Sequence, residues 1–140
     1  MTRIDFHFNT PDKLAYACRL IRKIVRSGER SVVFADRDTI GPLDQALWTF
    51  SELDFIPHVR AGDPLAAQTP VVLCSDAIDP PHCEVLVNLS GISPPFFSRF
   101  ERLIELVSAD TDDRTQARER WRFYKDRGYP LESHDLAAAR

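Results

Sequence analysis

The fold follows from one stretch, SVVFADRDTIGPLDQALWTF, residues 31–50. Its first five residues, SVVFA, form an almost unbroken apolar run, which is typical of a strand buried on both faces of a sheet. Residues 41–50 follow with apolar side chains at helical spacing, and the apolar side of this helix carries Leu43, Ala46, Leu47 and Phe50. A buried strand that leads into a helix is typical of a parallel sheet covered by helices.

The alternation of strand and helix continues on both sides of this stretch. Before it, residues 3–8 alternate as a strand does, and Thr10 followed by Pro11 predicts the start of a helix that ends at Gly28. After it, three more strands are predicted at residues 69–75, 83–90 and 102–109. A short helix or turn is predicted between the last two of these, at residues 94–100.

The pattern closes with one more helix, which begins among the acidic residues 110–113 and stops at Gly128. We therefore expect a single three-layer α/β/α domain over residues 1–130. Its sheet is expected to be parallel or mostly parallel, with Rossmann-like topology but without a nucleotide-binding glycine loop. Residues 58–69 are expected to be a loop, and residues 131–140, LESHDLAAAR, a frayed C-terminal tail.

Composition limits the kinds of partner that we expect. The 140 residues carry a net charge of -3, and no apolar run approaches the roughly 20 residues that cross a bilayer. The three cysteines are widely spaced and odd in number, which argues against a disulfide scaffold and suits a reducing cytoplasm. An acidic domain is a poor candidate for direct binding of duplex DNA. We therefore expect a cytoplasmic protein that binds no membrane and does not bind duplex DNA directly.

Most sequence motifs that carry chemistry are missing. The five glycines are scattered and form no G-x-G, and the turn after the first strand, FNTPDK, has no glycine that would let the backbone approach a pyrophosphate. The four histidines show no close metal-ligand spacing. We therefore expect no cofactor and no metal site.

One pattern resembles an enzyme. The strand at residues 31–35 ends in Asp36-x-Asp38, similar to the aspartate-nucleophile phosphatases, in which the first carboxylate attacks phosphorus and the second handles the leaving-group proton. Those enzymes place a threonine two residues beyond the second aspartate, whereas here Thr39 follows Asp38 directly. A solvated loop with a helix cap is the simpler interpretation. A small phosphatase-like enzyme using Asp36 and Asp38 is the alternative.

Aromatic residues gather where LDQALWTF runs into SELDFIPH. Trp48 and Phe55 lie close together in this sequence, and Trp48 falls outside the apolar stripe of its helix. The pattern leaves two interpretations open: ordinary core, or an outward-facing binding surface of the kind that large aromatic side chains supply.

The last helix is basic and aromatic although the chain is acidic. Its segment RTQARERWRFYKDRGY, residues 114–129, repeats basic residues at i, i+4, i+8 and i+11, which are Arg114, Arg118, Arg122 and Lys125. A neighbouring stripe, expected to pack against the sheet, consists of Ala117, Trp121, Tyr124 and Gly128. The basic face is either a solvated surface or a cleft in which arginines meet an acidic ligand beside an apolar floor.

The motifs LDQALWTF, FIPH and ARERWRFYKDRGY, in this order and at these spacings, resemble the chi subunit of the bacterial DNA polymerase III holoenzyme. The resemblance covers essentially the whole chain. It implies a non-catalytic accessory subunit that pairs with the psi subunit of the clamp loader. It also implies binding of the acidic C-terminal tail of single-stranded DNA-binding protein, which ends in a phenylalanine carboxylate, and a helicase-like partner that competes for the psi surface.

The resemblance also assigns residues. Trp48 and Phe55 would lie on the psi surface. The site for the acidic tail would consist of Val107, Arg114, Arg118 and Trp121. Members of the family can carry Lys in place of Arg114 and Tyr in place of Trp121, so this chain keeps the charge and the ring and has a larger apolar floor.

Overall fold

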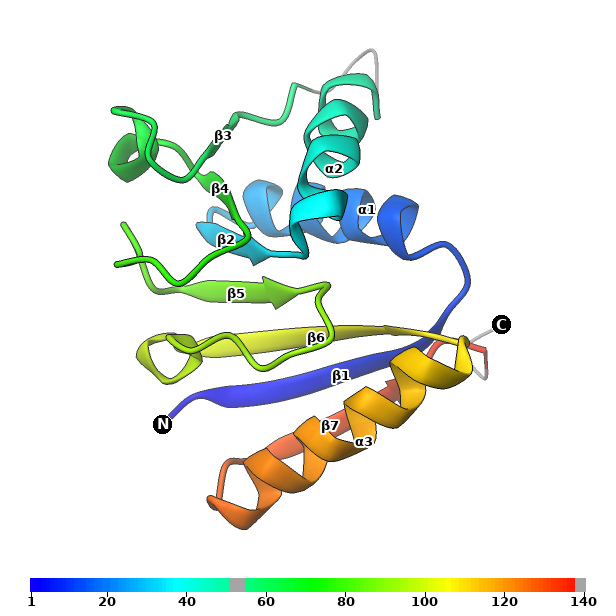
Figure 1. Ribbon diagram of the computed structural model, residues 1–140. Helices are drawn as coiled ribbons and strands as arrows, with labels where there is room; N and C mark the ends of the chain where they lie inside the picture. The colour runs from blue at the N-terminus through cyan, green and yellow to red at the C-terminus, as the bar shows by residue number, and fades with distance from the viewer. Residues whose placement is uncertain (51–54, 138–140) are drawn as a thin grey trace.

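The computed structural model describes residues 1–50 and 55–137, which fold around one sheet of seven parallel strands (Figure 1). The strands lie in the order β3-β4-β2-β5-β6-β1-β7. Their bounds are Arg3–Thr10 (β1), Ser31–Phe34 (β2), His58–Arg60 (β3), Val71–Cys74 (β4), Val85–Asn88 (β5), Arg102–Ser108 (β6) and Leu131–Asp135 (β7). The helices are α1 (Lys13–Arg26), α2 (Arg37–Thr49), α3 (Thr111–Asp126) and the short 3-10 segments η1 (Ala66–Gln68) and η2 (Phe97–Arg99).

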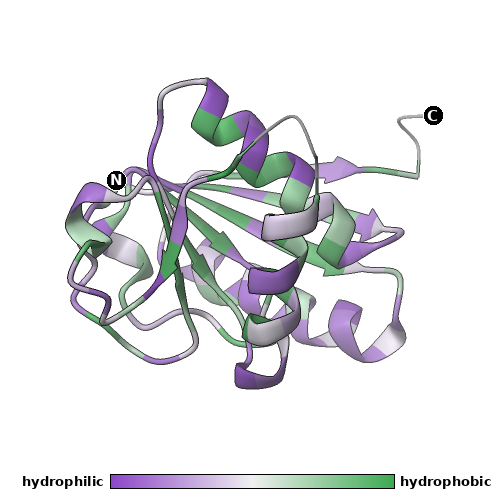
Figure 2. Cartoon of the chain, turned by 90° about the horizontal axis from the view of Figure 1, so that it is seen from above, coloured by the Kyte–Doolittle hydropathy of each residue, from purple (hydrophilic) through white to green (hydrophobic). Residues whose placement is uncertain are grey.

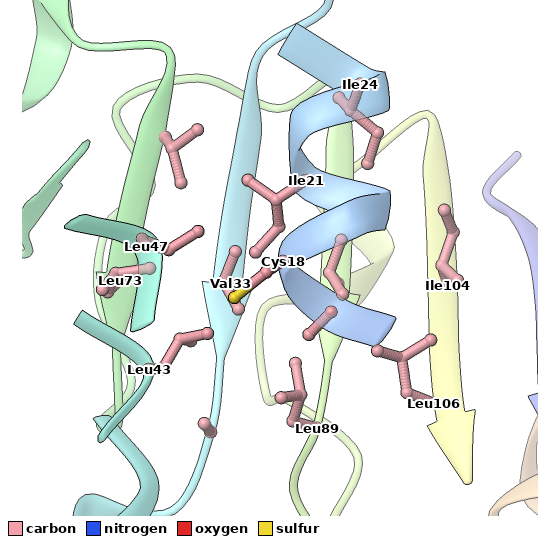
Figure 3. Packing of buried hydrophobic residues seen from close by; sticks show 14 of the residues in the cluster. Cys18, Ile21, Ile24, Val33, Leu43, Leu47, Leu73, Leu89, Ile104 and Leu106 are labelled. Carbon is pink, nitrogen blue, oxygen red and sulfur yellow. The ribbon is translucent and has the colours of Figure 1, made fainter. Parts of the chain in front are cut away.

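Helices cover both faces of this sheet, so the predicted three-layer α/β arrangement is confirmed. On one face, α1 and α2 contribute Cys18, Ile21, Leu43 and Leu47, which pack over Val33 and its neighbours (Figure 3). On the other face, α3 and the two 3-10 segments form a second apolar layer with the alternate side chains of the same strands. Figure 2 shows the apolar strands enclosed between helices whose residues alternate between hydrophobic and hydrophilic.

The start of α1 differs from the prediction. Thr10 is the last residue of β1, and its hydroxyl donates a hydrogen bond to the His7 carbonyl (3.1 Å), so Thr10 does not cap the helix. Asp12 is the cap instead, because its Oδ1 accepts a hydrogen bond from the Ala15 amide (3.1 Å). Pro11 consequently precedes the cap and is not the first helical residue.

The second helix, α2, begins at Arg37, one turn before the predicted start at Gly41. Pro42 lies inside α2. Asp36 takes the N-cap position and Asp38 lies in the first turn, where the helix dipole stabilises carboxylates. The Asp36 side chain makes no capping hydrogen bond, so both aspartates support the start of α2 through their charge alone.

The prediction of a frayed tail at residues 131–140 is wrong for its first half. Leu131–Asp135 form β7, which pairs in parallel with β1 over five residue pairs. Gly128 adopts φ 82° after α3, a conformation that glycine reaches without strain, and it turns the chain back toward the sheet. Residues 138–140 lie outside the described part of the chain.

The segment at residues 58–69 is also more ordered than predicted. His58–Arg60 form β3, the other edge strand, which pairs in parallel with β4. Ala66–Gln68 form a 3-10 turn. Both missed strands lie at sheet edges and need backbone hydrogen bonds to only one neighbour, so neither requires the apolar run that marks an inner strand.

The cysteines lie within this framework as free thiols. Cys18 and Cys74 are buried, and burial raises the pKa of their thiols to about 11 and about 12 respectively, so both stay protonated near neutral pH. Among the described helices, none combines the length and the apolarity needed to cross a membrane.

Candidate functional site

A hollow of about 290 Å³ lies between α3 and the β1–β7 side of the sheet. Four of its lining residues are those that the resemblance groups into one site: Val107, Arg114, Arg118 and Trp121. The other lining residues are Phe6, Phe8, Ala117 and Ser133. Residues from β6 and α3 thus meet on one surface, and β1 and β7 add a wall that the sequence analysis missed.

The floor of this hollow is apolar. The rings of Trp121 and Phe6 meet edge-on, with their centroids 5.2 Å apart. Val107 is buried, and it faces α3 because side chains alternate along β6, with Leu103 on the same face and Ile104 on the opposite one. The hollow therefore offers a hydrophobic surface near the edge of the sheet.

Two arginines form the rim of the hollow. Arg114 and Arg118 lie one turn apart on α3, and both are exposed. Within the described part of the chain, no carboxylate lies at ion-pair distance from either guanidinium. Because no described carboxylate neutralises these two charges, the rim favours an anionic ligand.

A buried polar network fixes α3 to the sheet beside this hollow. The two carboxylate oxygens of Glu105 accept hydrogen bonds from Asn88 Nδ2 (2.7 Å) and from the Tyr124 hydroxyl (2.6 Å). Arg120 Nε lies 3.3 Å from Glu105 Oε1, and Arg120 Nη1 donates to the Gly91 carbonyl (2.9 Å). Because Arg120 and Tyr124 both come from α3, these contacts set the rotation of the helix about its axis.

The core position of Arg120 is a functional detail that the sequence analysis missed. The residue is only 4% exposed, and its spacing from Ala117 and Tyr124 puts it on the stripe that faces the sheet. Burial raises the pKa of the Glu105 carboxyl, while the Arg120 cation and the hydrogen bonds from Tyr124 and Asn88 oppose that rise. Burial and the adjacent carboxylate raise the pKa of Tyr124, so its hydroxyl remains a donor.

A second surface contains the exposed aromatic pair. Trp48 is 54% exposed and Phe55 is 69% exposed, and their ring centroids lie 5.3 Å apart. The Trp48 ring also lies 4.6 Å from the ring of His58, whose Nε2 is 2.9 Å from Asp44 Oδ1 and whose Nδ1 is 2.7 Å from the Ile56 carbonyl. The hydrogen bonds hold the His58 ring in place, and the Trp48 ring packs against it, so we call this imidazole the His58 platform. The other side of the indole is exposed.

The two surfaces lie at opposite edges of the sheet. Trp48 lies at the end of α2, on the β3 side, whereas α3 lies beside β1 and β7 (Figure 1). The segment SELD between α2 and Phe55, residues 51–54, lies outside the described residues.

Asp36 and Asp38 lie at a third place, the edge of the sheet at which the parallel strands end. A hollow of about 510 Å³ opens there, where open α/β sheets usually bind ligands. The charged residues that line it are Lys13, Asp36, Asp38, Asp110, Asp112 and Asp113. Five carboxylates and one ammonium group give this hollow a net negative charge, which repels phosphate. The geometry therefore supports neither a nucleotide site nor a phosphatase site that works without a metal ion.

These observations first define a class: a parallel α/β protein with a basic-rimmed apolar hollow and an exposed aromatic pair, both suited to contacts with other macromolecules. Comparison with known proteins then gives the family. The family model for the DNA polymerase III chi subunit, HolC, matches residues 1–132, and the chain belongs to this family.

Individual relatives agree with this family. The chain is 37% identical to the DNA polymerase III subunit chi of Pseudomonas aeruginosa, with 97% of this chain and 98% of the relative covered. It is 27% identical to the corresponding subunit of Haemophilus influenzae (86% and 85% covered) and 26% identical to that of Escherichia coli strain K12 (81% and 79% covered). The family is named as a subunit of a DNA polymerase, so the chain has an accessory role in DNA replication.

Proposed function

We propose that this chain is a non-catalytic adaptor of the replicative polymerase in the cytoplasm. It bridges the clamp loader, through a psi subunit, to single-stranded DNA-binding protein by holding the acidic C-terminal tail of that protein. The observation that carries the proposal is the convergence of Val107, Arg114, Arg118 and Trp121 on one apolar hollow. The two arginines at its rim have no carboxylate partner among the residues that the structure describes.

The chemistry of the hollow matches such a tail. The apolar floor between Trp121, Phe6 and Val107 would receive the ring of the terminal phenylalanine. Arg114 and Arg118 would meet the acidic side chains and the free terminal carboxylate, because a guanidinium presents paired donors that fit a carboxylate. No cofactor is needed for this binding. Contact with DNA is then indirect, through the protein that coats the single strand.

Because the arginines bind charge and the floor binds the phenylalanine ring, we expect the affinity for the tail to depend only partly on salt. Calorimetric titration of an acidic peptide that ends in phenylalanine should give an affinity that falls as salt rises, because the Debye length shrinks from about 8 Å at physiological ionic strength to about 3 Å at 1 M. Some affinity should survive at high salt, because burial of the phenylalanine ring is apolar.

The matched control is the same peptide with alanine as its last residue. It should keep the salt dependence and lose the affinity that survives at high salt. Equal affinities for the two peptides, or tight binding of naked single-stranded DNA by the protein, would contradict the proposal.

The aromatic pair, Trp48 and Phe55, serves in this proposal as the surface for psi. Its two large exposed rings, their contact at 5.3 Å and the His58 platform support a hydrophobic docking surface. A helicase-like partner would compete for the same residues. Because this pair and the hollow lie at opposite sheet edges, psi and the acidic tail would bind without excluding one another.

Replacing Trp48 tests the psi surface. Trp48→Ala should weaken binding of psi by about 2 kcal/mol or more, roughly 30-fold, the usual cost of truncating an aromatic residue at the centre of an interface. The fold should survive because the side chain is already half exposed. Binding would be measured by titration with purified psi. The control is Ile92→Ala, an exposed apolar residue elsewhere, which should bind psi normally. An unfolded Trp48→Ala protein, or unchanged psi affinity, would refute this assignment.

A further inference from the structure

Pairing of β7 with β1 creates a cluster of metal-ligating side chains that neither strand has alone. Asp5 lies opposite Glu132 in the register, and His7 lies opposite His134. Alternation along β1 directs Asp5 and His7 away from the α3 hollow, because Phe6 points into it. Four polar side chains therefore share the opposite face of this sheet edge.

Three of these side chains have ligand atoms close enough for one ion. His134 Nε2 lies 3.5 Å from Asp5 Oδ1 and 3.9 Å from Glu132 Oε2. All three ligand atoms lie within 4.8 Å of one another, and no other group of three or more His, Cys, Asp or Glu residues in the described chain meets that condition. Bonds of 2.0–2.2 Å to a tetrahedral zinc ion require ligand atoms about 3.4 Å apart, so a small movement of exposed side chains would close the site.

Neighbouring groups orient the ligands. Arg102 Nε engages the other oxygen of Asp5, Oδ2, at 3.3 Å, which leaves Oδ1 for an ion. The His134 ring packs edge-on against His7, with centroids 5.1 Å apart, and His7 Nδ1 is itself held 2.7 Å from the Tyr16 hydroxyl. Partners of this kind fix the rotamers of metal ligands and strengthen binding. Two carboxylates against one guanidinium leave a net negative charge that attracts a cation.

We propose that Asp5, Glu132 and His134 form a binding site for a divalent transition-metal ion of the zinc class. Imidazole with carboxylate is a ligand set that suits zinc, and three protein ligands leave a fourth position for water. The ion would join the edge strand β7 to β1. Ser133, which lines the α3 hollow, lies between two of the ligands in the sequence, so the ion would also stiffen one wall of that hollow.

The test is a titration of chelator-treated protein with Zn²⁺ against a chromophoric competitor, repeated with Co²⁺ to record the absorption spectrum of the bound ion. All proteins carry Cys83→Ser, because this thiol is only half buried and next to His82. One Zn²⁺ should bind per chain. His134→Ala and Glu132→Gln should each weaken that binding at least about tenfold, and Co²⁺ should give a spectrum without thiolate bands.

A matched control is Glu119→Gln, which removes an exposed carboxylate on α3 and should leave zinc binding unchanged. Because Glu132 and His134 are exposed on an edge strand, both variants should stay folded, which circular dichroism checks. Absence of saturable zinc binding by the Cys83→Ser protein, or equal affinity in His134→Ala, would overturn the proposal.

Discussion

Arg120→Ala should lower the free energy of unfolding by about 3–5 kcal/mol, the usual cost of removing one partner from a buried ion pair. The substitution leaves Glu105 fully buried with its carboxylate facing an empty space where the guanidinium was. It also removes the donor to the Gly91 carbonyl, one of the contacts that tie α3 to the loop after β5. The loss at Glu105 arises in the interior, where water cannot compensate for it, and accounts for most of the expected effect, because the Gly91 contact is only partly buried.

Urea denaturation would measure this effect, with Arg122→Ala as the matched control on the same helix. Arg122 is exposed, so its removal should change stability by no more than about 0.5 kcal/mol. The slope of the unfolding free energy with urea should stay the same in both variants, because the surface exposed on unfolding is unchanged. Similar midpoints for Arg120→Ala and Arg122→Ala would show that the buried network contributes little.

The sequence predicted the inner part of this fold because hydrophobic runs report burial directly. The strands now seen as β2, β4, β5 and β6 are nearly continuous apolar stretches, and only a sheet covered on both faces buries them all. The edge strands carried no such signal. Residues 131–135, LESHD, are almost all polar, and their place in the sheet depends on backbone pairing with a strand at the other end of the chain.

That missed pairing explains why the sequence did not suggest the proposed metal site. Asp5 and His134 are separated by nearly the whole chain, and spacing along a sequence cannot show that two strands lie side by side. Arg120 is a different case, because its helical spacing from Ala117 and Tyr124 did indicate the buried stripe. Its charge favoured a surface position, and only the buried Glu105 on the neighbouring strand makes the core position tolerable.

Sequence pattern predicted some of the candidate binding residues, and the resemblance was needed for others. The periodicity of α3 alone identified the basic face that contains Arg114 and Arg118. Nothing in the spacing linked that face to Val107 in the preceding strand, and the resemblance supplied this link. Phe6, Phe8 and Ser133 were missed because they reach the hollow from β1 and from the unexpected strand β7.

Arg118→Ala should weaken binding of the acidic tail by about 2 kcal/mol, roughly 30-fold. Its guanidinium lies at the rim of the hollow without a carboxylate partner within the described chain, so its hydrogen bonds remain available to a ligand. Removal would leave a ligand carboxylate unpaired beside an apolar floor. Arg122→Ala is again the control, because this arginine lies on α3 outside the hollow and should cost little.

The most direct measurement uses Trp121 as its own reporter. The chain has two tryptophans, so Trp48→Phe leaves Trp121 as the only one. Titration of this protein with an acidic peptide ending in phenylalanine should give a saturable change in tryptophan emission, with the same dissociation constant as calorimetry. In the Arg118→Ala version the curve should shift to about 30-fold higher peptide concentration. Calorimetric binding with no change in Trp121 emission, or identical curves with and without Arg118, would contradict a tail site in the α3 hollow.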